Sequence, residues 1–195
     1  MQSFPMQSCL KSFLTAAILL LSASVWAQEV HRPQDPDLLG RFSYGDPASA
    51  QPDAVRQVCI SVSRDGDYRI VRSLNNGQAE RLQGKMPKEQ LQKLKTLVGA
   101  AEFRALTGNR GGLLRQPAES FGAEIPRGDD KAQRMQWLNA EGVGPFPDPV
   151  AKVVDWLKHF EPIEGKSFEY TDYPDVCPSS GLRLLQPSVA ENGRP

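Results

Sequence analysis

Apolar and polar residues alternate along the segment that begins at Val55, with Val58, Ile60 and Val62 on one parity. A period of two is typical of a β-strand that buries one face. Two turn signals follow, Asp-Gly at 65–66 and Asn-Asn-Gly at 75–77, and both favour the tight turns of β-hairpins. The pattern therefore predicts an antiparallel meander of three strands. These strands start at Val55, near Tyr68 and near Ala79.

Two later segments have the period of an amphipathic helix. The first starts at Pro87, which suits the first turn of a helix, and ends near Gly99. The second starts at Asp148, a favourable N-cap residue, and ends before Pro162. The predicted buried stripes are Leu91, Leu94, Leu97 and Val98 in the first helix, and Val150, Val153, Val154, Leu157 and Phe160 in the second.

Alternation returns between the two helices, through Phe121 to Ile125 and again through Met135 to Trp137. A turn at 126–130 separates these two short strands. The complete order is β-β-β-α-β-β-α. We therefore predict an α+β fold, in which an antiparallel sheet of about five strands carries two helices on one face.

The N-terminal segment 1–27 has the three parts of a secretory signal peptide. Lys11 precedes the apolar run 13–21, and small residues lead to a cleavage site after Ala27. A membrane anchor is the alternative, but the apolar run is short for a hydrocarbon layer of ~30 Å. We therefore expect export to the periplasm or the extracellular space, with no stable membrane insertion after cleavage.

The remaining chain divides into an arm, a core and a tail. Segment 28–54 holds four prolines and is predicted to be an extended, loosely ordered arm. The core domain covers 55–162. The tail covers 163–195, and its end is expected to be disordered. The earlier part of the tail contains Phe168, Tyr170 and Tyr173, which make it too apolar for a free segment.

Removal of the signal peptide also removes Cys9 and leaves Cys59 and Cys177 as the only cysteines. An oxidising compartment favours one disulfide between them, and two free thiols are the alternative. Because Val58, Ile60 and Val62 must face the helices, Cys59 is expected on the opposite face of the sheet. We therefore predict that the tail crosses this outer face and is held there by the Cys59–Cys177 disulfide.

Composition limits the classes of partner. The chain has 195 residues, with 23 basic and 23 acidic side chains, so its formal net charge is zero. This balance lacks the positive charge that binding to nucleic-acid phosphates requires, and we expect no nucleic-acid partner. Its hydrophobic content of 39% is ordinary for a globular domain.

Residues for catalysis are sparse. The two histidines, His31 and His159, lie far apart in the sequence, and no nucleophile, zinc, phosphate-loop or dinucleotide motif is recognisable. We therefore predict no catalytic, cofactor-binding or metal-binding residues, and a structural role for His159 at a helix C-terminus.

Two other patterns have alternative interpretations. Arg127-Gly128-Asp129 matches an adhesion tripeptide but also suits a turn, and Glu169, Asp172 and Asp175 suit a calcium site less well than a solvated acidic face.

Segment 86–106, with its helix followed by Phe103 and Leu106, resembles the corresponding segment of emfourin-like proteins. The meander before it and the hairpin and helix after it extend the resemblance over about 55–160. Emfourins are small bacterial inhibitors of thermolysin-like metallopeptidases, so the resemblance implies the fold and an inhibitory activity, although no inhibitory residue can be matched. Our functional hypothesis is an exported, non-catalytic binding domain whose partner is another exported protein. The alternatives are an inhibitor of a thermolysin-like metallopeptidase and, third, an uncharacterised enzyme.

Overall fold

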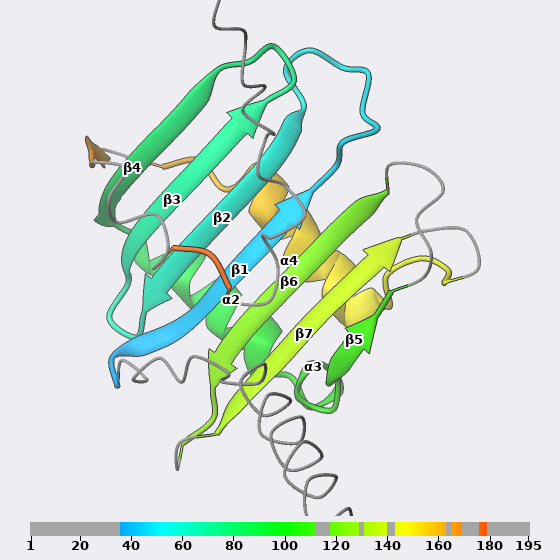
Figure 1. Ribbon diagram of the computed structural model, residues 1–195. Helices are drawn as coiled ribbons and strands as arrows, with labels where there is room; N and C mark the ends of the chain where they lie inside the picture. The colour runs from blue at the N-terminus through cyan, green and yellow to red at the C-terminus, as the bar shows by residue number, and fades with distance from the viewer. Residues whose placement is uncertain are drawn as a thin grey trace, which may run out of the picture. The chain divides into compact units, whose positions relative to one another are not determined.

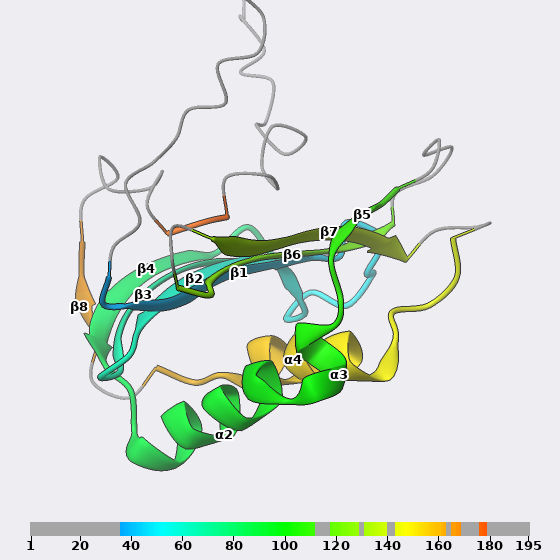
Figure 2. The ribbon, with the colours of Figure 1, turned by 90° about the horizontal axis from the view of Figure 1, so that it is seen from below.

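A mixed β-sheet of eight strands carries three helices on one of its faces (Figures 1 and 2). The computed structural model describes residues 36–111, 118–128, 131–139, 143–162, 165–168 and 176–178. The strand order is β5-β7-β6-β1-β2-β3-β4-β8. The strands are β1 (Leu38–Gly45), β2 (Val55–Ser63), β3 (Asp67–Leu74), β4 (Ala79–Lys85), β5 (Gly108–Arg110), β6 (Glu119–Pro126), β7 (Ala132–Asn139) and β8 (Lys166–Ser167). The helices are α2 (Lys88–Gly99), α3 (Ala101–Arg104) and α4 (Asp148–His159).

The prediction of an antiparallel sheet of about five strands with two helices is wrong, because β1, β5, β8 and the short helix α3 were not foreseen. All neighbouring strands pair antiparallel except β5 and β7, which are parallel, so the sheet is mixed. The five strands and two longer helices that the sequence patterns indicated are present in the predicted order.

The most consequential difference is β1, because segment 38–45 was assigned to the loosely ordered arm. This strand lies in the middle of the sheet, between β2 and β6, and pairs antiparallel with both. Leu38, Phe42 and Tyr44 of β1 are buried, but Gly40 interrupts the apolar alternation. A Cβ at Gly40 would lie 2.8 Å from Cζ of Phe42, so the missing side chain makes room for the Phe42 ring.

The other two unpredicted strands are short edge strands. β5 has three residues and β8 has two, so neither is long enough to show a period of two. Each is held by its pairing with a longer strand, β5 with β7 and β8 with β4. Tertiary pairing rather than local pattern therefore determines both edges of the sheet.

The core lies between the sheet and the helices (Figure 2). Val58, Ile60 and Val62 are completely buried on the helix side of β2, as predicted. In α2, Leu94 and Val98 are buried, whereas Leu91 and Leu97 of the predicted stripe are only partly buried. The stripe predicted for the second helix is completely buried together with Trp156, although its last residue, Phe160, follows the end of α4. The Trp156 indole donates a hydrogen bond of 3.1 Å to Oε1 of Gln90 and so links α4 to α2.

The face of the sheet that the helices leave uncovered is called the outer face here. Cys59 and Cys177 are paired as a disulfide on this face, with their Cα atoms 5.1 Å apart, as predicted. Val176 and Cys177 pack on Cys59, with Phe168 and Val71 beside them. Residues 176–178 lie on the opposite side of the sheet from the helices (Figure 2). The described tail residues 176–178 therefore pack on the outer face, whereas Tyr170 and Tyr173 lie outside the described residues.

Candidate functional site

The outer face carries an open groove of about 720 Å³ over β1, β2, β3, β4 and β8. A volume of this size is within the range of ~300–1,000 Å³ that ligand sites occupy. The groove is lined by residues of the meander strands β2, β3 and β4, and of β1 and β8, which lie on either side of the meander. Its polar lining includes Arg41, Ser61, Asp67, Arg69, Gln83 and Lys166.

Five of these residues form one row across the sheet. Strand register places Arg41 opposite Ser61, Ser61 opposite Arg69, Arg69 opposite Gln83 and Gln83 opposite Lys166. Directly paired residues of neighbouring strands point to the same face of a sheet. The strands of the row can be followed in Figure 1 from β1 to β4, with the helices behind them. We call this set the cross-strand row.

The lining of the groove is mainly cationic. Three of its charged residues are basic, namely Arg41, Arg69 and Lys166, and one is acidic, Asp67. The Asp67 carboxylate already lies 3.1 Å from the Lys85 ammonium group. Arg69 and Lys166 have no ion-pair partner within the parts of the chain that the structure describes. The groove is therefore a region of local positive charge on a chain of zero formal net charge.

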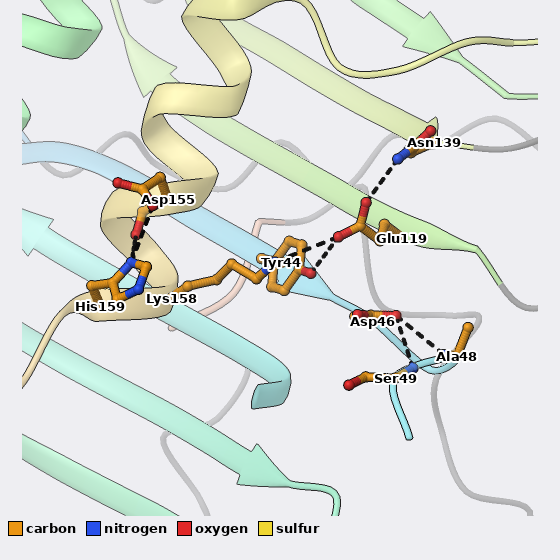
Figure 3. Close-up of polar contacts among 9 residues, drawn as sticks. All are labelled: Tyr44, Asp46, Ala48, Ser49, Glu119, Asn139, Asp155, Lys158 and His159. Carbon is orange, nitrogen blue, oxygen red and sulfur yellow. Dashed lines mark hydrogen bonds and ion pairs between the residues drawn. The ribbon is translucent and has the colours of Figure 1, made fainter. Parts of the chain in front are cut away.

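A second polar cluster lies on the helix side, where β1, β6, β7 and α4 meet (Figure 3). The Tyr44 hydroxyl donates a hydrogen bond of 2.7 Å to Oε1 of Glu119, and the Asn139 amide donates one of 2.7 Å to Oε2. The Lys158 ammonium group lies 3.6 Å from Oε1 of Glu119 and 4.9 Å from the centre of the Tyr44 ring. Glu119 therefore joins three secondary-structure elements to its own strand.

The electrostatics of this cluster suit a structural role. Burial raises the pKa of Tyr44, and the hydrogen bond to the Glu119 carboxylate raises it further. For Glu119, partial burial acts to raise the pKa, but the donors from Tyr44 and Asn139 and the charge of Lys158 outweigh it and leave the pKa below its ordinary value. General acid–base catalysis is most efficient for groups whose pKa lies near the working pH. Both groups are shifted away from neutrality, so the cluster is poorly suited to proton transfer there.

His159 lies at the exposed end of α4, away from Glu119 (Figure 3). Its Nδ1 donates a hydrogen bond of 2.8 Å to the backbone carbonyl of Asp155 and lies 3.2 Å from the Asp155 carboxylate. Both partners are on the preceding turn of the same helix. This arrangement agrees with the predicted structural role at the helix C-terminus. His31 lies outside the described residues.

Arg127, the first residue of the adhesion tripeptide, is engaged inside the fold. Its guanidinium donates a hydrogen bond of 3.0 Å to the Val98 carbonyl oxygen and another of 2.8 Å to Oε1 of Gln133. The Gln133 amide in turn donates to the carbonyl oxygens of Phe103 and Leu106. This network fastens the β6–β7 hairpin to the end of α2 and to α3, which favours the structural interpretation of the tripeptide. Asp129 lies outside the described residues.

The acidic group Glu169, Asp172 and Asp175 also lies outside the described residues. Among the residues that are described, no three histidine, cysteine or acidic side chains gather in the manner of a metal site. The helices in the described ranges are all too short or too polar to cross a membrane.

The cross-strand row was not identified from the sequence. Its members come from five separate strands, and two of those strands, β1 and β8, were not predicted. A partial signal was available in the predicted meander, where Ser61, Arg69 and Gln83 occupy outward-facing positions. The ends of the row, Arg41 and Lys166, became neighbours of this signal only through tertiary pairing.

Comparisons with known proteins identify no relative of this chain. No protein-family model matches the chain, and no curated protein or solved structure is similar to it. The resemblance to emfourin-like proteins therefore remains a hypothesis from the sequence.

Proposed function

We propose that this protein is an exported domain that acts by binding another exported protein, and that the outer face of its sheet is the binding surface. The observation that carries the proposal is the groove on that face, with its row of polar side chains drawn from five strands. Polar and charged side chains on rigid strands are suited to recognition because little conformational freedom is lost when a partner binds.

The disulfide supports the same surface. Cys59 lies in β2, two residues before Ser61 of the cross-strand row, and its bond to Cys177 keeps residues 176–178 on the outer face. A disulfide of this kind is stable in an oxidising compartment, which fits the proposed export. Binding on the helix side is less favoured, because that side of the sheet is filled by the core.

The test blocks the groove and leaves the rest of the fold intact. The mature protein is immobilised and used to capture binding proteins from the exported fraction of the source organism. A Ser61→Trp variant would fill the groove, whereas Gln92→Trp adds the same bulk to the exposed side of α2. We expect Ser61→Trp to abolish capture of the protein that the wild type retains, and Gln92→Trp to preserve it.

Circular dichroism and thermal unfolding of both variants provide the folding control. Equal capture by the wild type and the folded Ser61→Trp variant would show that the outer face is not the binding surface. Loss of capture in the Gln92→Trp variant alone would place the binding surface on the helices.

A further inference from the structure

We propose that the groove binds an acidic segment of the partner protein in the polyproline II conformation, with a carboxylate at every third position. This inference rests on the proposed function, since it specifies the chemistry that the outer face recognises. Three properties of the cross-strand row support it: the sign of its charge, the spacing of its cations, and the neutral side chains between them.

Charge selects an anionic ligand. The cationic residues Arg41, Arg69 and Lys166 line the groove, and the acidic Asp67 is already close to Lys85. Glu124, which pairs with Arg41 in register, lies 3.5 Å from Arg134. Whole-chain charge is zero, so this excess is local to the groove. Complementary charge at an interface increases the association rate and excludes partners of the wrong sign. Carboxylates of Asp or Glu are the groups in a protein segment that meet this requirement.

Spacing selects the conformation of the ligand. Arg41 is in β1, Arg69 is in β3 and Lys166 is in β8, so each cation is two strands from the next along the row. Neighbouring strands are ~4.8 Å apart, which places successive cations roughly 10 Å from one another. A polyproline II helix has three residues per turn and advances ~9.3 Å in each turn. Every third side chain therefore returns to the same side of the ligand at nearly the spacing of the cations.

A β-strand ligand fits the row less well. Residues three apart in a strand span a similar distance, roughly 10 Å, but they point to opposite faces. Only alternate carboxylates of such a strand would then meet a cation. The polyproline II conformation thus satisfies both the spacing and the direction of the three cationic side chains.

Neutral side chains favour a peptide as the ligand. Ser61 lies in the row between Arg41 and Arg69, and Gln83 lies between Arg69 and Lys166. A polyproline II helix makes no internal hydrogen bonds, so its backbone carbonyl groups remain available to donors. The Ser61 hydroxyl and the Gln83 amide can donate to such carbonyls, which occur between the acidic side chains of a peptide. This alternation of cations and neutral donors favours a protein segment over an anionic polysaccharide.

The experiment uses two fluorescein-labelled peptides of equal composition with the complete, disulfide-bonded protein. One has the order Glu-Pro-Pro-Glu-Pro-Pro-Glu, and the other has the order Pro-Pro-Glu-Glu-Glu-Pro-Pro. Fluorescence anisotropy at low ionic strength measures the dissociation constants. We expect the spaced peptide to bind about tenfold more tightly than the clustered one, since only its carboxylates have the spacing of the cations in the row, of which Arg69 and Lys166 have no ion-pair partner in the described residues. Added salt should weaken this binding.

Single substitutions locate the contact. Arg69→Gln should weaken binding of the spaced peptide by about tenfold, because it removes charge-assisted hydrogen bonds at the centre of the row. Lys166→Gln should weaken it by about threefold, because this lysine is exposed. Lys152→Gln, which removes an exposed lysine from α4, is the matched control and should leave the affinity unchanged.

Four outcomes would overturn the inference. Equal affinity for both peptides, or unchanged affinity in the folded Arg69→Gln variant, would exclude recognition by the row. Tighter binding of trigalacturonate than of the spaced peptide would identify a polysaccharide as the ligand. Binding of the peptide only after Glu169, Asp172 and Asp175 are replaced by Ser would show that the chain's own acidic segment occupies the groove.

Failure of this inference can be distinguished from failure of the proposed function. If neither peptide binds but Ser61→Trp still abolishes capture of the exported partner, the outer face is the binding surface and only the ligand chemistry is wrong. If Ser61→Trp has no effect on capture, the proposed function itself is wrong.

Discussion

The Tyr44 hydroxyl donates a hydrogen bond of 2.7 Å to Oε1 of Glu119, although the two residues lie 75 positions apart in the sequence. Tyr44 belongs to the central strand β1, and Glu119 begins β6. The bond therefore fastens the unpredicted strand to its neighbour at the point where α4 ends above the sheet (Figure 3). Its importance for stability can be measured directly.

We expect Tyr44→Phe to lower the free energy of unfolding by about 1–3 kcal/mol, because the partly buried Glu119 carboxylate loses a donor. Tyr68→Phe provides a matched control. The Tyr68 hydroxyl is buried and has no hydrogen-bond partner in the described part of the chain, so its removal should be neutral or stabilising. Urea unfolding of both variants measures the difference. Equal destabilisation by the two substitutions would contradict the assigned role of the Tyr44–Glu119 bond.

Stability should decrease in acid through Glu119. The folded protein holds the pKa of Glu119 below its ordinary value of 4.5, mainly through hydrogen bonds that outweigh the effect of burial. A carboxyl group with a lowered pKa stabilises the fold above its unfolded pKa, and this contribution is lost as the pH falls through the folded value. The urea concentration at the unfolding midpoint should therefore decrease as the pH is lowered below about 4.5. This decrease should be smaller in a Glu119→Gln variant. An identical pH profile in that variant would exclude Glu119 as a source of the acid sensitivity.

Replacing the disulfide should have a large effect. Cys59 and Cys177 are 118 positions apart, and a closed loop of this length is expected to stabilise the fold by roughly 4–5 kcal/mol in the chain-entropy model. We expect the Cys59→Ser/Cys177→Ser double variant to lose a similar free energy of unfolding, measured by urea titration under oxidising conditions. Non-reducing peptide mass spectrometry of the wild type confirms the link, and two free thiols in the exported protein would refute it.

The Gln133 network should be essential for the attachment of the β6–β7 hairpin. Gln133 is buried, and its amide donates to the carbonyl oxygens of Phe103 and Leu106 while its Oε1 accepts from Arg127. Gln133→Leu would leave these groups without their partner, and we expect a loss of about 2–3 kcal/mol. Gln136→Leu, on the opposite face of the same strand, is the control. It should change the free energy of unfolding by only about 0.5 kcal/mol, which is usual for surface substitutions. Similar losses in both variants would argue against the network.

Export can be tested at the N-terminus. Because the charged, apolar and small-residue parts of the predicted signal end at Ala27, N-terminal sequencing of the exported protein should begin at Gln28. Protein that retains Met1 and stays in the cytoplasm would contradict the prediction and remove the basis for an exported partner.

Local patterns in the sequence were sufficient for the elements with clear periods. Val58, Ile60 and Val62 indicated β2 and its buried face, and the apolar stripes indicated α2 and α4. The same parity placed Cys59 on the outer face, and the two cysteines that remain after the predicted signal peptide indicated the disulfide with Cys177. In these segments the side chains that a helix or a strand buries recur at the period of that element, so the chain itself carries the information.

Tertiary structure decided the centre and the edges of the sheet. Gly40 hides the period of β1, because the Phe42 ring occupies the space of its missing side chain, and the edge strands β5 and β8 exist only through pairing with β7 and β4. The groove follows from these pairings, since Arg41 and Lys166 join the outward residues of the meander only when β1 and β8 are in register. Such neighbours are far apart in the chain, and their proximity is a property of strand register, which no local period encodes.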